Sequence, residues 1–138
     1  MARQRSASRP RVLIVEDEAL QAYSMARLVE GEGFEVVGPA HDEHLALQLI
    51  GSDPPDIAVV DIDLSGPRRP REAAARCTSA QVVSALTDWG VPYVLVTAHD
   101  GVSFLAPDAS RAPRLSKPYR AEDLRMILRD ALTMDVPA

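Results

Sequence analysis

Short runs of apolar residues alternate along this chain with longer stretches in which apolar residues recur every three or four positions. The short runs are typical of buried strands, and they occupy residues 11–16, 34–40, 56–61, 91–97 and 113–116. Helical spacing is found at 18–32 and 42–51, before Gly90, and from Leu124 to Ala131. This alternation predicts an α/β fold with a doubly wound, five-stranded parallel sheet covered by helices on both faces.

Two details of the pattern predict specific features of the fold. In the third helical segment Leu86 and Trp89 have the spacing of core residues, and Gly90 is expected to close the helix. The pair Gly38-Pro39 is expected to stop the second strand.

Composition narrows the class of protein. A chain of 138 residues, 46% of them hydrophobic, is expected to form one domain with its own core. The net charge of -5 is poorly suited to binding nucleic acid or an anionic membrane, and no apolar run is long enough to span a bilayer. The single cysteine excludes an internal disulfide and fits the reducing cytoplasm. We expect a disordered basic tail at residues 1–10, the domain at 11–133 and a short tail at 134–138, with no output domain.

Polar residues stand where four of the predicted strands end. They are Glu16, Asp17, Asp61, Asp63, Thr97 and Lys117. The carboxyl ends of parallel strands share one edge of a sheet, and ligands bind beyond that edge. Carboxylates gathered there repel one another, and a divalent cation offsets the repulsion. An all-oxygen set of ligands favours Mg²⁺.

This set of groups is suited to phosphoryl chemistry. The Asp61 carboxylate could attack a phosphoryl group in line and form an acyl phosphate. Such a transfer depends mostly on positioning and on neutralising charge at the equatorial oxygens. Magnesium would take one of these oxygens, Lys117 a second, and the Thr97 hydroxyl with a nearby backbone N–H the third.

The motifs that carry these residues are "VLIVEDE", "VVDIDL", "VLVTAHD" and "LSKPY". In this order, from Val12 to Ala131, they resemble the receiver domain of bacterial two-component response regulators. The resemblance implies a (βα)5 flavodoxin-like fold with strand order 2-1-3-4-5. It also implies that a histidine kinase or phosphotransfer protein phosphorylates Asp61, and that the chain is a signalling protein rather than an enzyme with a separate substrate. The output would be altered affinity for an unknown downstream protein, or onward phosphotransfer; pairing of two copies is left open.

The same resemblance implies roles for the acidic edge. Magnesium would be held by Asp17, Asp61 and the backbone carbonyl at Asp63, with Glu16 reaching the metal directly or through water. Asp63 and His99 would flank the path of the water that hydrolyses the acyl phosphate.

The resemblance also implies a phosphate-binding and switching group. Its members are Thr97, Ala98 and Lys117. The Lys117-Pro118 peptide bond would be cis. Arg114 stands where many receivers carry a switch aromatic, a role that Tyr119 or Phe104 could take instead.

The sequence departs from the family pattern in other places too. The acidic pair is Glu16-Asp17 rather than two aspartates. The third crossover is several residues longer than usual and includes a Pro- and Arg-rich stretch at 65–80, interpreted as a loop with a frayed helix. Residues 100–112 are too few and too proline-marked for a full fourth helix, so a shortened one is expected.

Three alternatives share parts of the pattern. In haloacid-dehalogenase-type phosphatases the acidic pair comes last in the chain, whereas here it comes first. Toprim domains would explain Glu16, Asp61 and Asp63 but not Thr97 or Lys117, and they act on nucleic acid. The third alternative is a pseudo-receiver, a binding module that keeps the fold without the chemistry.

Overall fold

The structure is a computed structural model, and it describes residues 9–61, 78–97 and 112–133. Its elements in chain order are β1 (Arg11–Val15), α1 (Ala19–Gly31), β2 (Glu35–Ala40), α2 (Glu43–Ser52), β3 (Ile57–Asp61), α4 (Thr78–Asp88), β4 (Tyr93–Thr97), β5 (Arg114–Ser116) and α5 (Ala121–Thr133). Most of the tail predicted at 1–10, most of the loop predicted at 65–80, nearly all of the stretch 100–112 with its shortened helix, and the tail predicted at 134–138 lie outside the described residues.

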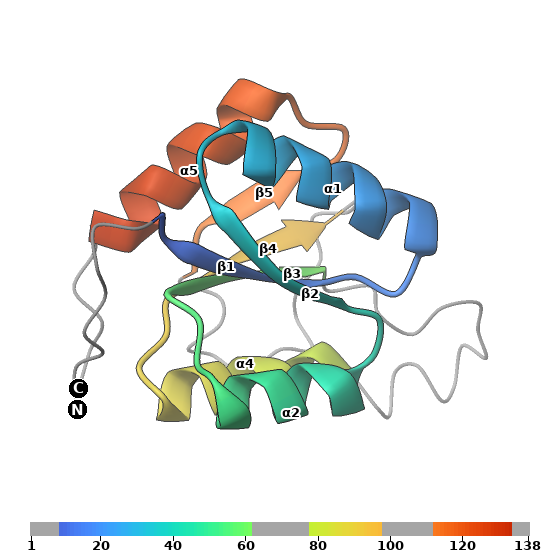
Figure 1. Ribbon diagram of the computed structural model, residues 1–138, viewed down its shortest axis with the longest axis vertical. Helices are drawn as coiled ribbons and strands as arrows, with labels where there is room; N and C mark the ends of the chain where they lie inside the picture. Colours follow the sequence, from blue (N-terminus) through green and yellow to red (C-terminus); the bar gives the residue numbers. More distant parts are fainter. Residues whose placement is uncertain (1–8, 62–77, 98–111, 134–138) are drawn as a thin grey trace.

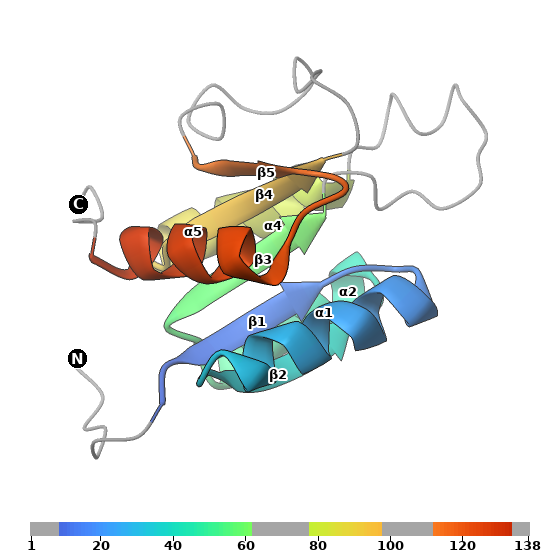
Figure 2. The ribbon, with the colours of Figure 1, turned by 90° about the horizontal axis from the view of Figure 1, so that it is seen from above.

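The strands form one parallel sheet in the order β2-β1-β3-β4-β5, which confirms the doubly wound α/β fold and the predicted strand order. Figures 1 and 2 show α1 and α5 side by side over one face of the sheet, with α2 and α4 over the other. Among the described residues, no helix combines the length and the apolar character needed to cross a bilayer.

The central strand β3 contributes to the core on both faces of the sheet. Ile57 and Val59 pack in the layer beneath α1 and α5, whereas Ala58 and Val60 pack in the layer against α2 and α4. All of β3 is buried, including its last residue, Asp61. The strand β3 has two further strands on each side of it in the sheet and apolar side chains on both of its faces. It therefore fixes the position of the buried Asp61 carboxylate at its end.

The end of α4 corrects one prediction. Leu86 is fully buried as expected, but Trp89 is 54% exposed, so its assignment to the core is wrong. α4 ends at Asp88, and Trp89 lies in the turn that follows, where Gly90 has a positive φ of 69°. Past the last helical residue, the helical spacing no longer directs a side chain into the core.

The end of β2 corrects a second prediction. The strand does not stop at Gly38-Pro39 but continues through both residues to Ala40. The pairing of β1 with β2 shifts register between Leu13 and Val15, and Gly38 has a φ of +91°. A Cβ on Gly38 would lie 2.7 Å from the backbone nitrogen of Ala40, so glycine is required at this irregularity.

These environments predict that truncation destabilises the protein much more at Leu86 than at Trp89. Leu86→Ala should lower the free energy of unfolding by about 2–5 kcal/mol, because it leaves a cavity between α4 and the sheet. Trp89→Ala should cost less than about 1 kcal/mol, because more than half of the side chain is already in water. Urea unfolding of both variants measures the difference; equal losses would contradict the exposed position of Trp89.

Candidate functional site

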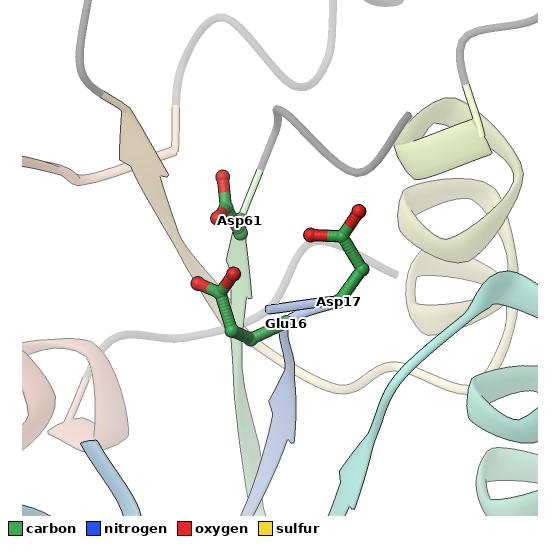
Figure 3. A group of neighbouring side chains, drawn as sticks. All are labelled: Glu16, Asp17 and Asp61. Carbon is green, nitrogen blue, oxygen red and sulfur yellow. The ribbon is translucent and has the colours of Figure 1, made fainter. Parts of the chain in front are cut away.

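The register of the strands brings the predicted polar residues to one edge of the sheet. Glu16 follows β1 directly and lies beside Asp61, which ends the neighbouring β3. On the other side of β3, the backbone N–H of Lys117 donates to the carbonyl of Thr97 at 2.9 Å, so the end of β5 is aligned with the end of β4. Figure 3 shows the carboxylates of Glu16, Asp17 and Asp61 gathered at this edge.

Three carboxylates form the acidic group of the site. Each of Glu16, Asp17 and Asp61 offers one oxygen, and these oxygens all lie within 4.8 Å of one another. Glu16 is 2% exposed and Asp61 3% exposed, whereas Asp17 is half-buried. Two of the three carboxylates are therefore largely buried. Their mutual repulsion is stronger in the protein interior than it would be in water.

Backbone groups on two sides hold Glu16 in place. Its N–H donates to the carbonyl of Ala40 at 2.9 Å, which extends the β1–β2 pairing by one residue. Its Oε2 accepts the N–H of Glu18 at 3.1 Å, at the start of α1. Its Oε1 is buried and has no hydrogen-bond partner among the described residues. Such an oxygen needs either a proton or a cation.

The surroundings of Glu16 favour its protonated form. Burial raises the pKa of Glu16 from 4.5 to about 8, and the neighbouring Asp61 carboxylate adds to the effect. The Glu18 N–H and the charge of Lys117 act in the opposite direction but are weaker. Two ionised carboxylates can only accept hydrogen bonds, so contact between Glu16 and Asp61 becomes favourable when Glu16 holds a proton.

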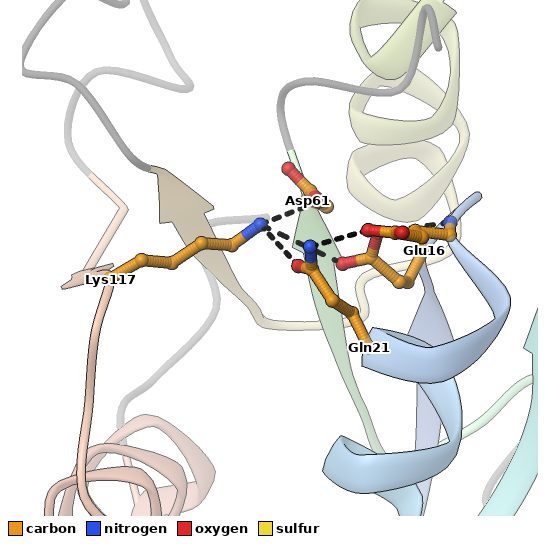
Figure 4. A network of polar contacts seen from close by, with 5 residues as sticks. Glu16, Gln21, Asp61 and Lys117 are labelled. Carbon is orange, nitrogen blue, oxygen red and sulfur yellow. Dashed lines mark hydrogen bonds and ion pairs between the residues drawn. The ribbon is translucent and has the colours of Figure 1, made fainter.

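Lys117 brings the positive charge of the site from the end of β5. Its Nζ lies 3.1 Å from Asp61 Oδ2 and 3.9 Å from Glu16 Oε1, so it bonds the first carboxylate and faces the second. The same ammonium donates to Oε1 of Gln21, on the first turn of α1, at 2.9 Å (Figure 4). The lysine side chain is mostly buried, 22% exposed, which strengthens its interaction with Asp61.

Gln21 was not predicted from the sequence. It lies 96 positions from Lys117, and no motif marks it. The available signal was weak: Gln21 stands one helical turn past Asp17, on a helix that begins directly after the acidic pair. A polar side chain there can reach over the edge of the sheet.

The remaining predicted residues differ in how the structure describes them. Thr97 ends β4 and is 3% exposed. The Lys117-Pro118 bond is cis. Arg114 is exposed on β5, whereas Tyr119 is half-buried against the core beneath α1 and α5. Burial, and then the charges of Glu16 and Asp61, raise the pKa of Tyr119 to about 12, so it stays a neutral phenol beside the site. Asp63, Ala98, His99 and Phe104 lie outside the described residues.

The acidic group fits a magnesium ion. Magnesium is held by oxygen ligands at about 2.1 Å, so ligands on opposite sides of the ion are about 4.2 Å apart. The oxygens of Glu16, Asp17 and Asp61, within 4.8 Å of one another, are close to this spacing. The buried Glu16 Oε1 without a hydrogen-bond partner among the described residues is an oxygen that such an ion would satisfy.

Comparison with known proteins identifies the family. The response regulator receiver domain matches residues 12–129, and the chain belongs to this family. It is 34% identical over 117 residues to the transcriptional regulatory protein PdtaR of Mycobacterium tuberculosis, covering 83% of this chain and 52% of the relative. It is 36% identical over 124 residues to the positive alginate biosynthesis regulatory protein of Pseudomonas aeruginosa, covering 87% of this chain and 46% of the relative. The chain thus spans about half the length of these relatives.

Solved structures share the fold. A CheY-like response regulator receiver domain protein from Methanospirillum hungatei matches 91% of this chain and 94% of its own, with a TM-score of 0.73 and 22% identity. The receiver domain of a modulated diguanylate cyclase from Desulfovibrio desulfuricans matches 91% of this chain and 94% of its own, with a TM-score of 0.69 and 29% identity. The receiver family points to signalling by phosphorylation in two-component systems, and the phosphatase and Toprim alternatives are set aside.

The buried acid predicts how metal-free protein responds to pH. Between pH 4.5 and about 8 the folded protein keeps a proton on Glu16 that the unfolded chain releases, so stability should fall as pH rises through this window. Glu16→Gln mimics the protonated acid and should flatten the decline, gaining about 1–2 kcal/mol at pH 8. Urea unfolding in a chelator, from pH 5 to 8.5, measures both effects. The exposed Glu30→Gln on α1 is the control and should follow the wild type.

Proposed function

We propose that this protein accepts a phosphoryl group on Asp61 from a histidine kinase or phosphotransfer protein, with Mg²⁺ as cofactor, and signals through the phosphorylated form. One observation carries the proposal: the buried Asp61 carboxylate lies between an acidic group suited to a cation and the ammonium of Lys117, 3.1 Å away. A buried aspartate with a purely structural role would need only a cationic partner such as Lys117, and not two further carboxylates beside it.

The transfer follows from this arrangement. An oxygen of Asp61 attacks the phosphorus atom of phosphohistidine in line, and the new O–P bond forms as the P–N bond breaks. The electron pair of the broken bond stays with the nitrogen that carried the phosphoryl group, and the imidazole leaves neutral, with its proton on the other ring nitrogen. Lys117 stays beside Asp61 throughout and offsets negative charge on a phosphoryl oxygen.

Glu16, Asp17 and Asp61 would hold the magnesium ion, together with the backbone carbonyl at Asp63. When bound, the ion supplies positive charge to a second phosphoryl oxygen. Thr97 ends the strand next to Asp61, and its hydroxyl with the N–H of Ala98 would bind the third. We assign Asp63 and His99 to tuning the hydrolysis of the acyl phosphate.

A mass measurement tests the phosphoacceptor. Wild-type protein incubated with phosphoramidate and Mg²⁺ should gain one phosphoryl group, and the gain should be lost in Asp61→Ala or in excess chelator. Asp88→Ala, an exposed aspartate at the end of α4, should be phosphorylated like the wild type. A wild type that gains nothing would instead support the pseudo-receiver, and a gain that persists in Asp61→Ala would place the phosphoryl group elsewhere.

The output is assigned to the face formed by β5 and α5. Thr97 is bonded through its backbone to Lys117 at the end of β5, so movement of Thr97 toward the phosphoryl group would be passed to that face. A change in the affinity of this face for another protein is then the signal.

Thr97→Ala separates acceptance of the phosphoryl group from output. The variant should still be phosphorylated, about ten- to a hundredfold more slowly than the wild type, because one hydrogen bond to the phosphoryl group is lost while Asp61, Lys117 and the acidic group remain. It should lose the phosphorylation-dependent change in amide hydrogen exchange over residues 114–133 that the wild type shows. The same exchange change in both proteins would exclude Thr97 as the switch.

A further inference from the structure

We propose that Gln21 is a positioning residue for Lys117, which it holds beside Asp61 in the geometry needed to accept a phosphoryl group. The proposal rests on the proposed function, because it concerns the rate of that same transfer. Gln21 belongs to α1, whereas Lys117 follows β5, so the contact joins the first helix to the end of the last strand.

The contact is one link in a chain of three polar interactions. The Glu18 carboxylate accepts from Nε2 of Gln21 at 2.6 Å, Oε1 of Gln21 accepts from Lys117 Nζ at 2.9 Å, and the same Nζ donates to Asp61 at 3.1 Å. Figure 4 shows the Gln21 amide below the line from Lys117 to Asp61, with its oxygen toward the ammonium. These three hydrogen bonds thus connect the start of α1 to Asp61, the proposed phosphoacceptor.

Elementary hydrogen-bond chemistry fixes the orientation of the Gln21 amide. A carboxylate only accepts and an ammonium only donates, so the amide must turn its NH₂ toward Glu18 and its oxygen toward Lys117. Glu18 occupies the N-cap position of α1, yet its side chain makes no capping hydrogen bond. This carboxylate is used to orient Gln21 instead of to satisfy the end of the helix.

The need for such a residue follows from the length of the lysine side chain. Lysine carries a compact charge on a flexible four-carbon stem, and holding that charge at one point costs conformational entropy. In the resting site the ammonium is attracted by both Asp61 and Glu16, 3.1 and 3.9 Å away. A second acceptor, on α1, restricts the ammonium to one place at the rim of the site.

Gln21 is exposed, so replacing it removes the hydrogen bond without opening a cavity. Gln21→Met keeps the length and helix propensity of the side chain and removes its acceptor. Gln48→Met makes the same change at an exposed position on α2, away from the site, and is the matched control. The double variant Glu18→Gln/Gln21→Glu exchanges the two side chains, preserves net charge and again offers an oxygen to Lys117.

The experiment is a time course of phosphorylation by phosphoramidate at saturating Mg²⁺, followed by intact mass, with the melting temperature of each variant. Gln21→Met should be phosphorylated about fivefold more slowly, which corresponds to the loss of one solvent-exposed hydrogen bond of about 1 kcal/mol. Its melting temperature should match that of Gln48→Met. The exchanged double variant should recover roughly half of the wild-type rate or more, because the acceptor is restored.

The possible outcomes distinguish failure of the positioning role of Gln21 from failure of the proposed phosphorylation of Asp61. A wild type that is phosphorylated while Gln21→Met reacts equally fast or faster overturns the positioning role and leaves the proposed function standing. A slow double variant, no better than Gln21→Met, also overturns it, because the acceptor would then not be what matters. A lowered melting temperature in Gln21→Met alone would show a structural role instead. Absence of any phosphorylation in the wild type refutes the proposed function itself.

Discussion

The repulsion between buried carboxylates is the constraint on which this site depends. Glu16 directly follows β1, and Asp61 ends the neighbouring β3. Both are almost fully buried, and like charges repel most strongly in the protein interior. A proton on Glu16, the ammonium of Lys117 and a bound cation are three ways to reduce the same excess of negative charge. The first two are present in the chain's own chemistry. The rest of the fold supplies the apolar packing that offsets the cost of keeping the acids together.

This constraint also explains why the site joins elements that are distant in the chain. Neutralising a charge at the end of β3 requires a cation from another strand, and Lys117 comes from beyond β5. Keeping a flexible lysine in place requires a further contact, which comes from α1 through Gln21. Polar contacts between side chains therefore connect α1, the end of β3 and the end of β5 at this edge of the sheet.

Much of this arrangement could be predicted from the sequence because it follows from periodicity. The apolar runs around residues 12–15 and 57–60 predict strands buried on both faces, and parallel strands bring Glu16 and Asp61 to a common edge. Trp89 was misplaced because helical spacing says nothing about where the last turn ends. Gln21 could not be found because its role depends on how far one lysine side chain reaches across the fold.

The irregularity in β2 has a consequence for transplanting the site. The N–H of Glu16 donates to the carbonyl of Ala40, and Ala40 stands opposite the end of β1 because the pairing shifts register at Gly38 and Pro39. A graft that copied only the ends of β1 and β3 onto another scaffold would carry the three acids but lose their support. The smallest part of the fold that could be transplanted with this acidic edge intact therefore includes three strands, β1, β3 and β2. The edge strand β2 is needed although none of the three carboxylates comes from it.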